Sequence, residues 1–179
     1  MLKHKLSLGL FVVAAAFAAL TFLPNSAGAT TATNTLTVTA SVSQNCVVGS
    51  QTLAFGAYDP IVTNAASGAN KTTSATLTFN CTKGSASVYV TADQGLNHAN
   101  ASGTTRAMNS GSNYLSYELY TDSGFTNVWN TTNNGTNDFQ PSFTSSSSAT
   151  ATVYGSIPKG QNPAVSATYS DSVTMTINF

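Results

Sequence analysis

Residues 35–46 read Thr-Leu-Thr-Val-Thr-Ala-Ser-Val-Ser-Gln-Asn-Cys. Apolar residues occupy every second position of this stretch, with Thr or Ser between them. They are Leu36, Val38, Ala40 and Val42. Strict alternation is typical of a β-strand that buries one face. The strand ends shortly before Cys46 and can pair with the chain's own sheet or with that of another molecule.

The residues before this strand predict export. Lys3 and Lys5 precede an apolar run over residues 6–23, and Ala27-Gly28-Ala29 supplies small residues at its exit. This arrangement is typical of a secretory signal peptide over residues 1–29, cleaved after Ala29. A membrane-spanning helix is the alternative interpretation of the run, but the basic start and the Ala-x-Ala exit favour cleavage. Since no second long apolar run follows, we expect no membrane span in the cleaved protein.

The cleaved chain has about 150 residues, enough for one domain with a hydrophobic core. Beyond residue 29 it carries four Lys or Arg and six Asp or Glu, which gives a net charge of −2. The absence of a basic cluster argues against a nucleic-acid partner. Charged residues make up only 7% of the whole sequence, so electrostatic repulsion between copies is weak. Such a surface suits a self-associating subunit and equally a secreted protein with an uncharged surface.

Cys46 and Cys81 are the two cysteines of the chain. Because the exported protein meets an oxidising environment, we expect them to form a disulfide. They stand 35 positions apart, and closing a loop of this length contributes about 3–4 kcal/mol in the chain-entropy description. Neither belongs to a Cys-x-x-Cys pair, which argues against redox catalysis and zinc binding.

The rest of the chain predicts many short strands and no amphipathic helix. Alternating or β-rich segments end in polar turns, which favours a β-sandwich or barrel. The predicted strands cover residues 53–55, 72–81, 88–90, 114–121, 149–154 and 169–179. We expect 72–81 and 88–90 to form a hairpin with its turn near residues 82–85, and residues 93–113 to form a long connection or an irregular edge. The last strand alternates to the final residue of the sequence, with Val173, Met175, Ile177 and Phe179 inward.

Residues that could carry catalysis are sparse. His98 is the one histidine after residue 29, and it lies among Asn and Ala in a polar loop. No hydrolase, zinc-protease or phosphate-loop motif occurs, so we predict that the chain is no enzyme and needs no cofactor or metal. Four aromatic residues could form a carbohydrate-stacking surface but more often fill a sandwich core. They are Tyr114, Tyr117, Tyr120 and Trp129.

Two longer stretches carry a family resemblance. Residues 115–122 read Leu-Ser-Tyr-Glu-Leu-Tyr-Thr-Asp, and residues 153–161 read Val-Tyr-Gly-Ser-Ile-Pro-Lys-Gly-Gln. Shorter elements stand at residues 46–47, 55–59, 81–84, 106–108, 129 and 169–173. In this order they resemble the spore coat protein U domain family, which includes subunits of archaic (Csu-type) chaperone–usher pili. The resemblance spans residues 46–179. Trp129-Asn130 stands where the family often has Trp-Gly, and residues 131–148 look individual to this chain.

The resemblance implies an all-β, immunoglobulin-like sandwich that lacks its last strand. A periplasmic pilus chaperone would complete it first, and the N-terminal strand of another subunit would replace the chaperone strand. The implied organisation is a donor strand over residues 30–45 and a pilin domain over residues 46–179. The implied partners are the chaperone, an outer-membrane usher and other copies of the chain. By the same resemblance, the strand through Val173, Met175, Ile177 and Phe179 borders the open groove and presents its terminal carboxylate to the chaperone.

These implications predict a cell-surface pilus subunit that serves adhesion and biofilm formation. A self-complemented secreted or spore-coat protein is one alternative, in which the N-terminal strand folds back on its own sheet. A carbohydrate-binding tip adhesin is another. The length argues against the adhesin, since such a protein would need a receptor domain beside the pilin domain.

Overall fold

The computed structural model describes residues 28 and 30–179. The predicted signal peptide therefore lies almost wholly outside the described residues. The chain divides after Ala40. Residues 30–40, the described part of the first unit together with Gly28, are exposed and have no regular secondary structure. Among the described residues, no helix has the length and apolar character needed to cross a bilayer.

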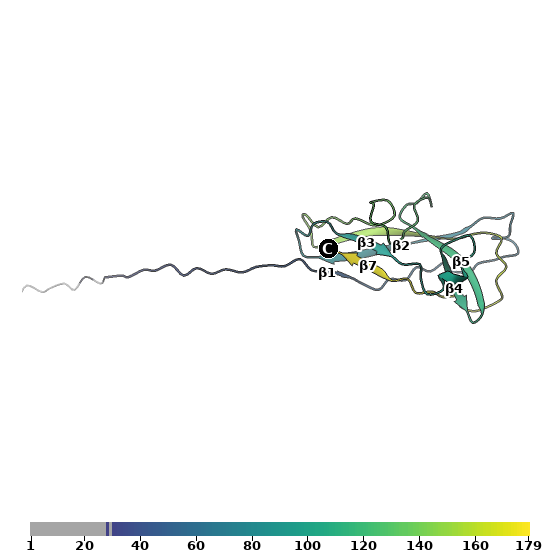
Figure 1. Cartoon of the computed structure of the whole chain (residues 1–179), viewed down its shortest axis with the longest axis horizontal. Helices are drawn as coiled ribbons and strands as arrows, with labels where there is room; N and C mark the ends of the chain where they lie inside the picture. The colour runs from purple at the N-terminus through teal and green to yellow at the C-terminus, as the bar shows by residue number, and fades with distance from the viewer. Residues whose placement is uncertain (1–27, 29) are drawn as a thin grey trace, which may run out of the picture. The chain divides into compact units, whose positions relative to one another are not determined.

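The regular secondary structure of the second unit, residues 41–179, consists of antiparallel strands and one short 3-10 turn (Figure 1). Its elements in chain order are β1 (Cys46–Val48), β2 (Lys71–Cys81), β3 (Tyr89–Ala92), a 3-10 turn (His98–Asn100), β4 (Arg106–Ser110), β5 (Asn113–Tyr120), β6 (Ser148–Ile157) and β7 (Met175–Asn178). One sheet has the order β1-β2-β6-β5-β4, and the second pairs β3 with β7. The two sheets share one core, to which β2, β3, β5, β6 and β7 all contribute. This is the predicted all-β sandwich.

Alternation accounts for the long strands of the first sheet. In β2 the residues Leu77, Phe79 and Cys81 are buried, while the residues between them point outward. Strand β6 lies beside β2 over ten paired residues, from Lys71 opposite Ile157 to Asn80 opposite Ser148. Burying a Leu or Phe side chain contributes about 1.5–3 kcal/mol, so the inward residues hold this ladder in register.

The predicted hairpin of residues 72–81 and 88–90 is wrong. Strand β2 pairs with β1 and β6, whereas β3 pairs with β7 in the other sheet. The turn at residues 82–85 is present, with the Ser85 amide donating to Thr82 O at 3.0 Å. It carries the chain across the sandwich rather than back along the same sheet. Alternation reports a buried face and contains no information about which strand lies alongside.

Strand β4 lies within residues 93–113, which were predicted as a long connection or an irregular edge, and it forms an edge of the first sheet. The strand pairs with β5 through a two-residue turn, Gly111 and Ser112, between Ser110 and Asn113. Gly111 has φ of 61°, and glycine at this position is favoured in a tight hairpin because it adopts positive φ without steric cost. Arg106 at the start of β4 obscured the strand, since a buried arginine is rare.

Candidate functional site

An open groove runs along the sandwich between two chain segments. It consists of two adjoining cavities of about 500 and 620 Å³. One border is residues 51–58, and the other is residues 168–175, extended by 163–167 in the second cavity. The two cavities share Leu53, Phe55, Met108 and Tyr169 in their walls. Core side chains form the floor of the first cavity, among them Leu77, Leu119, Trp129 and Val153.

The border at residues 168–175 is bonded on the side away from the groove. Ser170 and Asn109 exchange two backbone hydrogen bonds at 2.9 and 3.0 Å, and the Asp93 amide donates to Thr174 O at 3.1 Å. Between these ties, within the described part of the chain, the backbone of residues 171–173 makes no hydrogen bond. A strand with unpaired N–H and C=O groups is a template for a further strand.

The opposite border has even fewer backbone ties. Residues 53–55, predicted as a short strand, belong to no ladder here. The one hydrogen bond to their backbone among the described residues runs from Thr73 Oγ1 to Ala54 O, at 3.0 Å. Both borders therefore offer backbone groups to an additional strand laid between them.

Side-chain packing on Gly155 holds this second border in place. A Cβ atom at Gly155 would lie 2.7 Å from Phe55 Cζ and 2.8 Å from Leu53 Cδ2. Only glycine allows the two side chains to approach the β6 backbone so closely. The Phe55 ring also meets Tyr117 edge to face, with ring centroids 5.9 Å apart. Gly155 thus sets how far residues 53–55 stand from the opposite border.

Two carboxylates fix the first border. Asp171 accepts hydrogen bonds from Tyr117 Oη at 2.8 Å and from the Leu96 amide at 3.0 Å. Asp93 Oδ1 accepts the Thr174 and Gly95 amides, each at 2.9 Å. Burial by itself would raise the pKa of Asp93, but the hydrogen bonds from Thr174 and Gly95 outweigh it and hold the pKa below its usual value.

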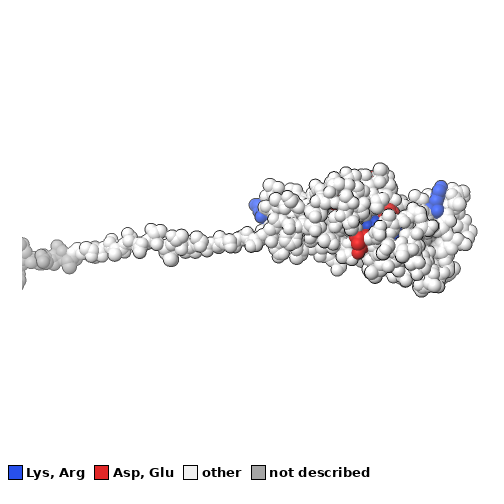
Figure 2. Space-filling model, viewed as in Figure 1, with Lys and Arg blue, Asp and Glu red and all other residues white. Residues whose placement is uncertain are grey.

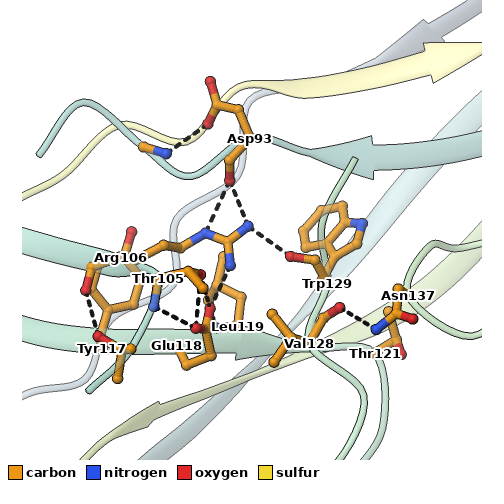
Figure 3. Close-up of polar contacts among 12 residues, drawn as sticks. Asp93, Thr105, Arg106, Tyr117, Glu118, Leu119, Thr121, Val128, Trp129 and Asn137 are labelled. Atoms are coloured by element: carbon orange, nitrogen blue, oxygen red, sulfur yellow. Dashed lines mark hydrogen bonds and ion pairs between the residues drawn. The ribbon is translucent and has the colours of Figure 1, made fainter. Parts of the chain in front are cut away.

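A buried ion pair between Arg106 and Glu118 lies next to Asp93, which holds the first border (Figure 3). Arg106 Nη1 lies 2.5 Å from Glu118 Oε1, and both side chains are buried. The guanidinium also donates to Asp93 O and to Trp129 O, the latter at 2.7 Å. Thr105 donates its amide and its hydroxyl to the Glu118 carboxylate. No described buried side-chain polar atom lacks a partner, so the pair is fully hydrogen-bonded despite its burial.

The residues predicted for the donor strand and for the edge of the groove differ in their exposure. Leu36, Val38 and Val42 are 84–85% exposed, and Ala40 is exposed as well. Val173 and Met175 line the groove. Ile177 packs against the core from β7, and Phe179 is 54% exposed. Sequence reasoning did not assign Leu53, Phe55 and Gly155 to the groove, although the alternation of Leu53 and Phe55 was a usable signal.

The predicted disulfide is present. Cys46 and Cys81 are bonded and pair across β1 and β2. The aromatic residues weighed as a sugar platform are not gathered on one surface, because Tyr117 and Trp129 are buried in the core. Trp129 donates its indole N–H to Val90 O at 3.0 Å, as a core tryptophan commonly does.

Comparisons with known proteins agree with this architecture. Residues 32–176 match the family described as the Spore Coat Protein U domain. Protein U of Myxococcus xanthus is 40% identical over 179 aligned positions, which cover 93% of this chain and 94% of that protein.

Among solved structures, the fold resembles a chain in the pre-assembly complex of the chaperone CsuC and the tip adhesion subunit CsuE, from the archaic chaperone–usher Csu pili of Acinetobacter baumannii. The TM-score is 0.51 at 19% identity, and the match covers 77% of this chain and 40% of that one. At this identity the likeness concerns the fold. The family match and the identity to Protein U together show that the chain belongs to the spore coat protein U domain family.

Proposed function

We propose that this protein is a structural subunit that polymerises by β-strand donation, each copy laying its residues 36–42 into the groove of another. The observation that carries the proposal is the open groove with unpaired backbone on both borders. In the same chain, three large apolar residues of an alternating segment are almost fully exposed. The groove lacks a strand between its borders, and the N-terminal segment lacks a surface that covers its apolar side chains.

The energetics favour this pairing. Leu36, Val38 and Val42 present apolar side chains on one face of an extended segment, and burying each contributes about 1.5–3 kcal/mol. Backbone hydrogen bonds to both borders would add to this. Donation from one copy to the next is a head-to-tail contact that does not close on itself, so it produces a fibre.

The proposal extends to partners and location. A subunit with an open groove exposes core residues and is prone to aggregation before assembly. A periplasmic chaperone that fills the groove and an outer-membrane usher that exchanges chaperone for subunit would solve this problem. The fibre would then be a cell-surface pilus that serves adhesion and biofilm formation, with a structural rather than an enzymatic role for this chain.

A matched pair of charge substitutions tests the proposal. Val38→Asp places a carboxylate on the inward face of the donor segment, whereas Thr37→Asp places the same charge on the outward face. We expect Val38→Asp to abolish polymers seen by electron microscopy and on unheated detergent gels, because an unpaired charge would have to be buried. Thr37→Asp should polymerise like the unmodified protein. If the two variants polymerised equally well, the proposal would be contradicted. It would also be contradicted if the unmodified protein remained monomeric because its N-terminal segment fills its own groove.

A further inference from the structure

Three exposed apolar residues stand at one end of the groove. Ile61 and Val62 are 77% and 72% exposed, and Val165 is fully exposed. We call these three residues the apolar tip. Pro60, which precedes Ile61, and Val165 both line the second cavity, so the tip continues the groove outward. It precedes β2, whose other end carries Cys81; eleven residues of strand separate the tip from the disulfide by about 33 Å.

The loop that carries Ile61 and Val62 is ordered by its own hydrogen bonds. The Asp59 carboxylate accepts the amides of Ile61 and Val62 at 2.9 and 3.2 Å. These bonds hold the pKa of Asp59 below its usual value. Asn64, only 2% exposed, bonds to the Asp59 amide and to Ala69 O at 3.0 and 2.8 Å. Two β-branched apolar side chains are therefore held outward by a rigid loop, and binding to them costs little further ordering.

The same loop is anchored to the border of the groove. The Gly160 amide donates to Asn64 O at 2.7 Å, and Tyr58 Oη donates to Pro158 O at 2.9 Å. A Cβ atom at Gly160 would lie 3.2 Å from Ala66 Cα. Ile61 and Val62 are consequently held in a fixed position relative to residue Tyr58 of the groove wall, and a surface that docks on them is placed relative to the groove's occupant.

The donor segment limits what can lie beside the tip. Val42 stands four residues before Cys46, and four extended residues reach about 14 Å at most. The domain that donates the strand must therefore abut the end of the groove that receives Val42. At the other end, β1 of the acceptor contacts β7, and the acceptor's own N-terminal segment leaves there. The end with the apolar tip has the space for the donating domain.

We propose that the apolar tip of each subunit docks against the base of the copy that donates its strand, with Val47 at the centre of the contact. Val47 follows Cys46 directly and is 57% exposed. Lys83 follows Cys81 by two positions, Lys159 Nζ donates to Gly68 O in the loop that carries Ile61 and Val62, and charged atoms are few on the face shown in Figure 2. This inference rests on the proposed strand donation.

Cysteine cross-linking tests the contact in fibres of the full chain. Val47→Cys combined with Val62→Cys should give a ladder of covalent oligomers after treatment with a short bis-maleimide. The two positions lie near opposite ends of β2, so a short linker cannot join them within one subunit. Val47→Cys with Asn133→Cys is the control. The stretch that contains Asn133 leads to Phe139, which pairs with β3 at Val90, and none of these three residues lines the groove.

The outcomes separate this inference from the proposed function. A ladder with Val62→Cys and none with Asn133→Cys supports the tip contact. Fibres that form normally but give no ladder with Val62→Cys overturn it and leave strand donation intact. Absence of polymer from the unmodified chain overturns both.

A second variant distinguishes a subunit contact from an adhesive surface. Ile61→Asn with Val62→Asn keeps Asp59 and Asn64 in place and should leave binding of a peptide of residues 34–44 unchanged, while the fibre dissociates at a lower temperature. An unchanged dissociation temperature, together with lost adsorption to hydrocarbon-coated surfaces, would show that the tip binds apolar surfaces and not a second copy.

Discussion

At the scale of single residues, Arg106 is the unusual feature. It is a fully buried cation in a chain with few charges, and its guanidinium joins the end of β3, strand β5 and Trp129. A buried ion pair gains little net stability when it is complete, but it becomes costly when one partner is removed. Arg106 and Glu118 therefore act as a positional constraint beneath the groove.

Arg106→Leu should lower the free energy of unfolding by about 3–5 kcal/mol, because it leaves the Glu118 carboxylate buried without its cation. Chemical denaturation of the purified protein measures the loss. Lys83→Leu removes an exposed cation and is the matched control, expected to stay within about 0.5 kcal/mol of the unmodified protein. If Arg106→Leu changed the free energy of unfolding as little as Lys83→Leu does, the burial of Arg106 would have no energetic consequence.

Asp93 predicts a dependence on acid. Its pKa is lowered in the folded state, so its contribution to stability is present above the unfolded value of 3.8 and is lost as pH falls through the folded value. Asp93→Asn can keep an oxygen that accepts the Thr174 and Gly95 amides. Because asparagine lacks the charge, the variant should be less stable than the unmodified protein at neutral pH, and its decline in stability below about pH 4 should be flatter. Denaturation series across this range measure it, and an unaltered acid decline would contradict the assignment.

At the scale of elements, the two borders of the groove differ in how they are held. Residues 170–174 are tied by backbone bonds and by the carboxylates of Asp93 and Asp171. Residues 51–57 depend chiefly on two side chains packed over Gly155 of β6. The width of the groove is therefore controlled by β6, a strand that lies in the floor rather than at the border.

Gly155→Val should displace Leu53 and Phe55, since its Cβ would lie within 3 Å of both side chains. We expect a stability loss of about 1–3 kcal/mol from overpacking and a weaker affinity for a peptide of residues 34–44. Thr152→Val changes the opposite face of the same strand and should bind the peptide normally. Calorimetric titration compares the variants. Unchanged affinity for Gly155→Val would show that residues 53–55 do not border the binding site.

At the scale of the whole molecule, the disulfide stands where the N-terminal segment leaves the domain. Cys46 is the first residue of β1, and its bond to Cys81 fastens β1 to the end of β2. A force applied through a donated strand would enter the domain at this point. The crosslink keeps β1 in its sheet, so that the load passes to the long β2–β6 ladder.

Cys46→Ser with Cys81→Ser should lower the free energy of unfolding by about 3–4 kcal/mol, because the unfolded chain regains the freedom of a 35-residue loop. This is a large share of a typical stability of about 5–15 kcal/mol. Denaturation of the unmodified protein in reductant should coincide with that of the double variant. No effect of reductant on the unmodified protein would contradict the prediction.

The sequence by itself determined the fold class, the long strands and the crosslink. Period-two alternation is a local record of one buried face, so β2, β5 and β6 could be predicted from their own residues. The pair of Cys46 and Cys81 followed from there being only two cysteines in a chain whose first residues predict export.

Only the tertiary structure decided which strands pair and what borders the groove. The β2–β3 hairpin was wrong, and the bounds and partner of the edge strand β4 were not predicted, because pairing depends on contacts between residues far apart in the chain. The burial of Arg106 depends on Glu118, twelve positions away, together with Asp93 and Trp129. Gly155 reads as an ordinary strand glycine until Leu53 and Phe55, about a hundred positions earlier, are placed over it. Local periodicity can predict that a residue is buried, but the residue that buries it is set by the folded chain as a whole.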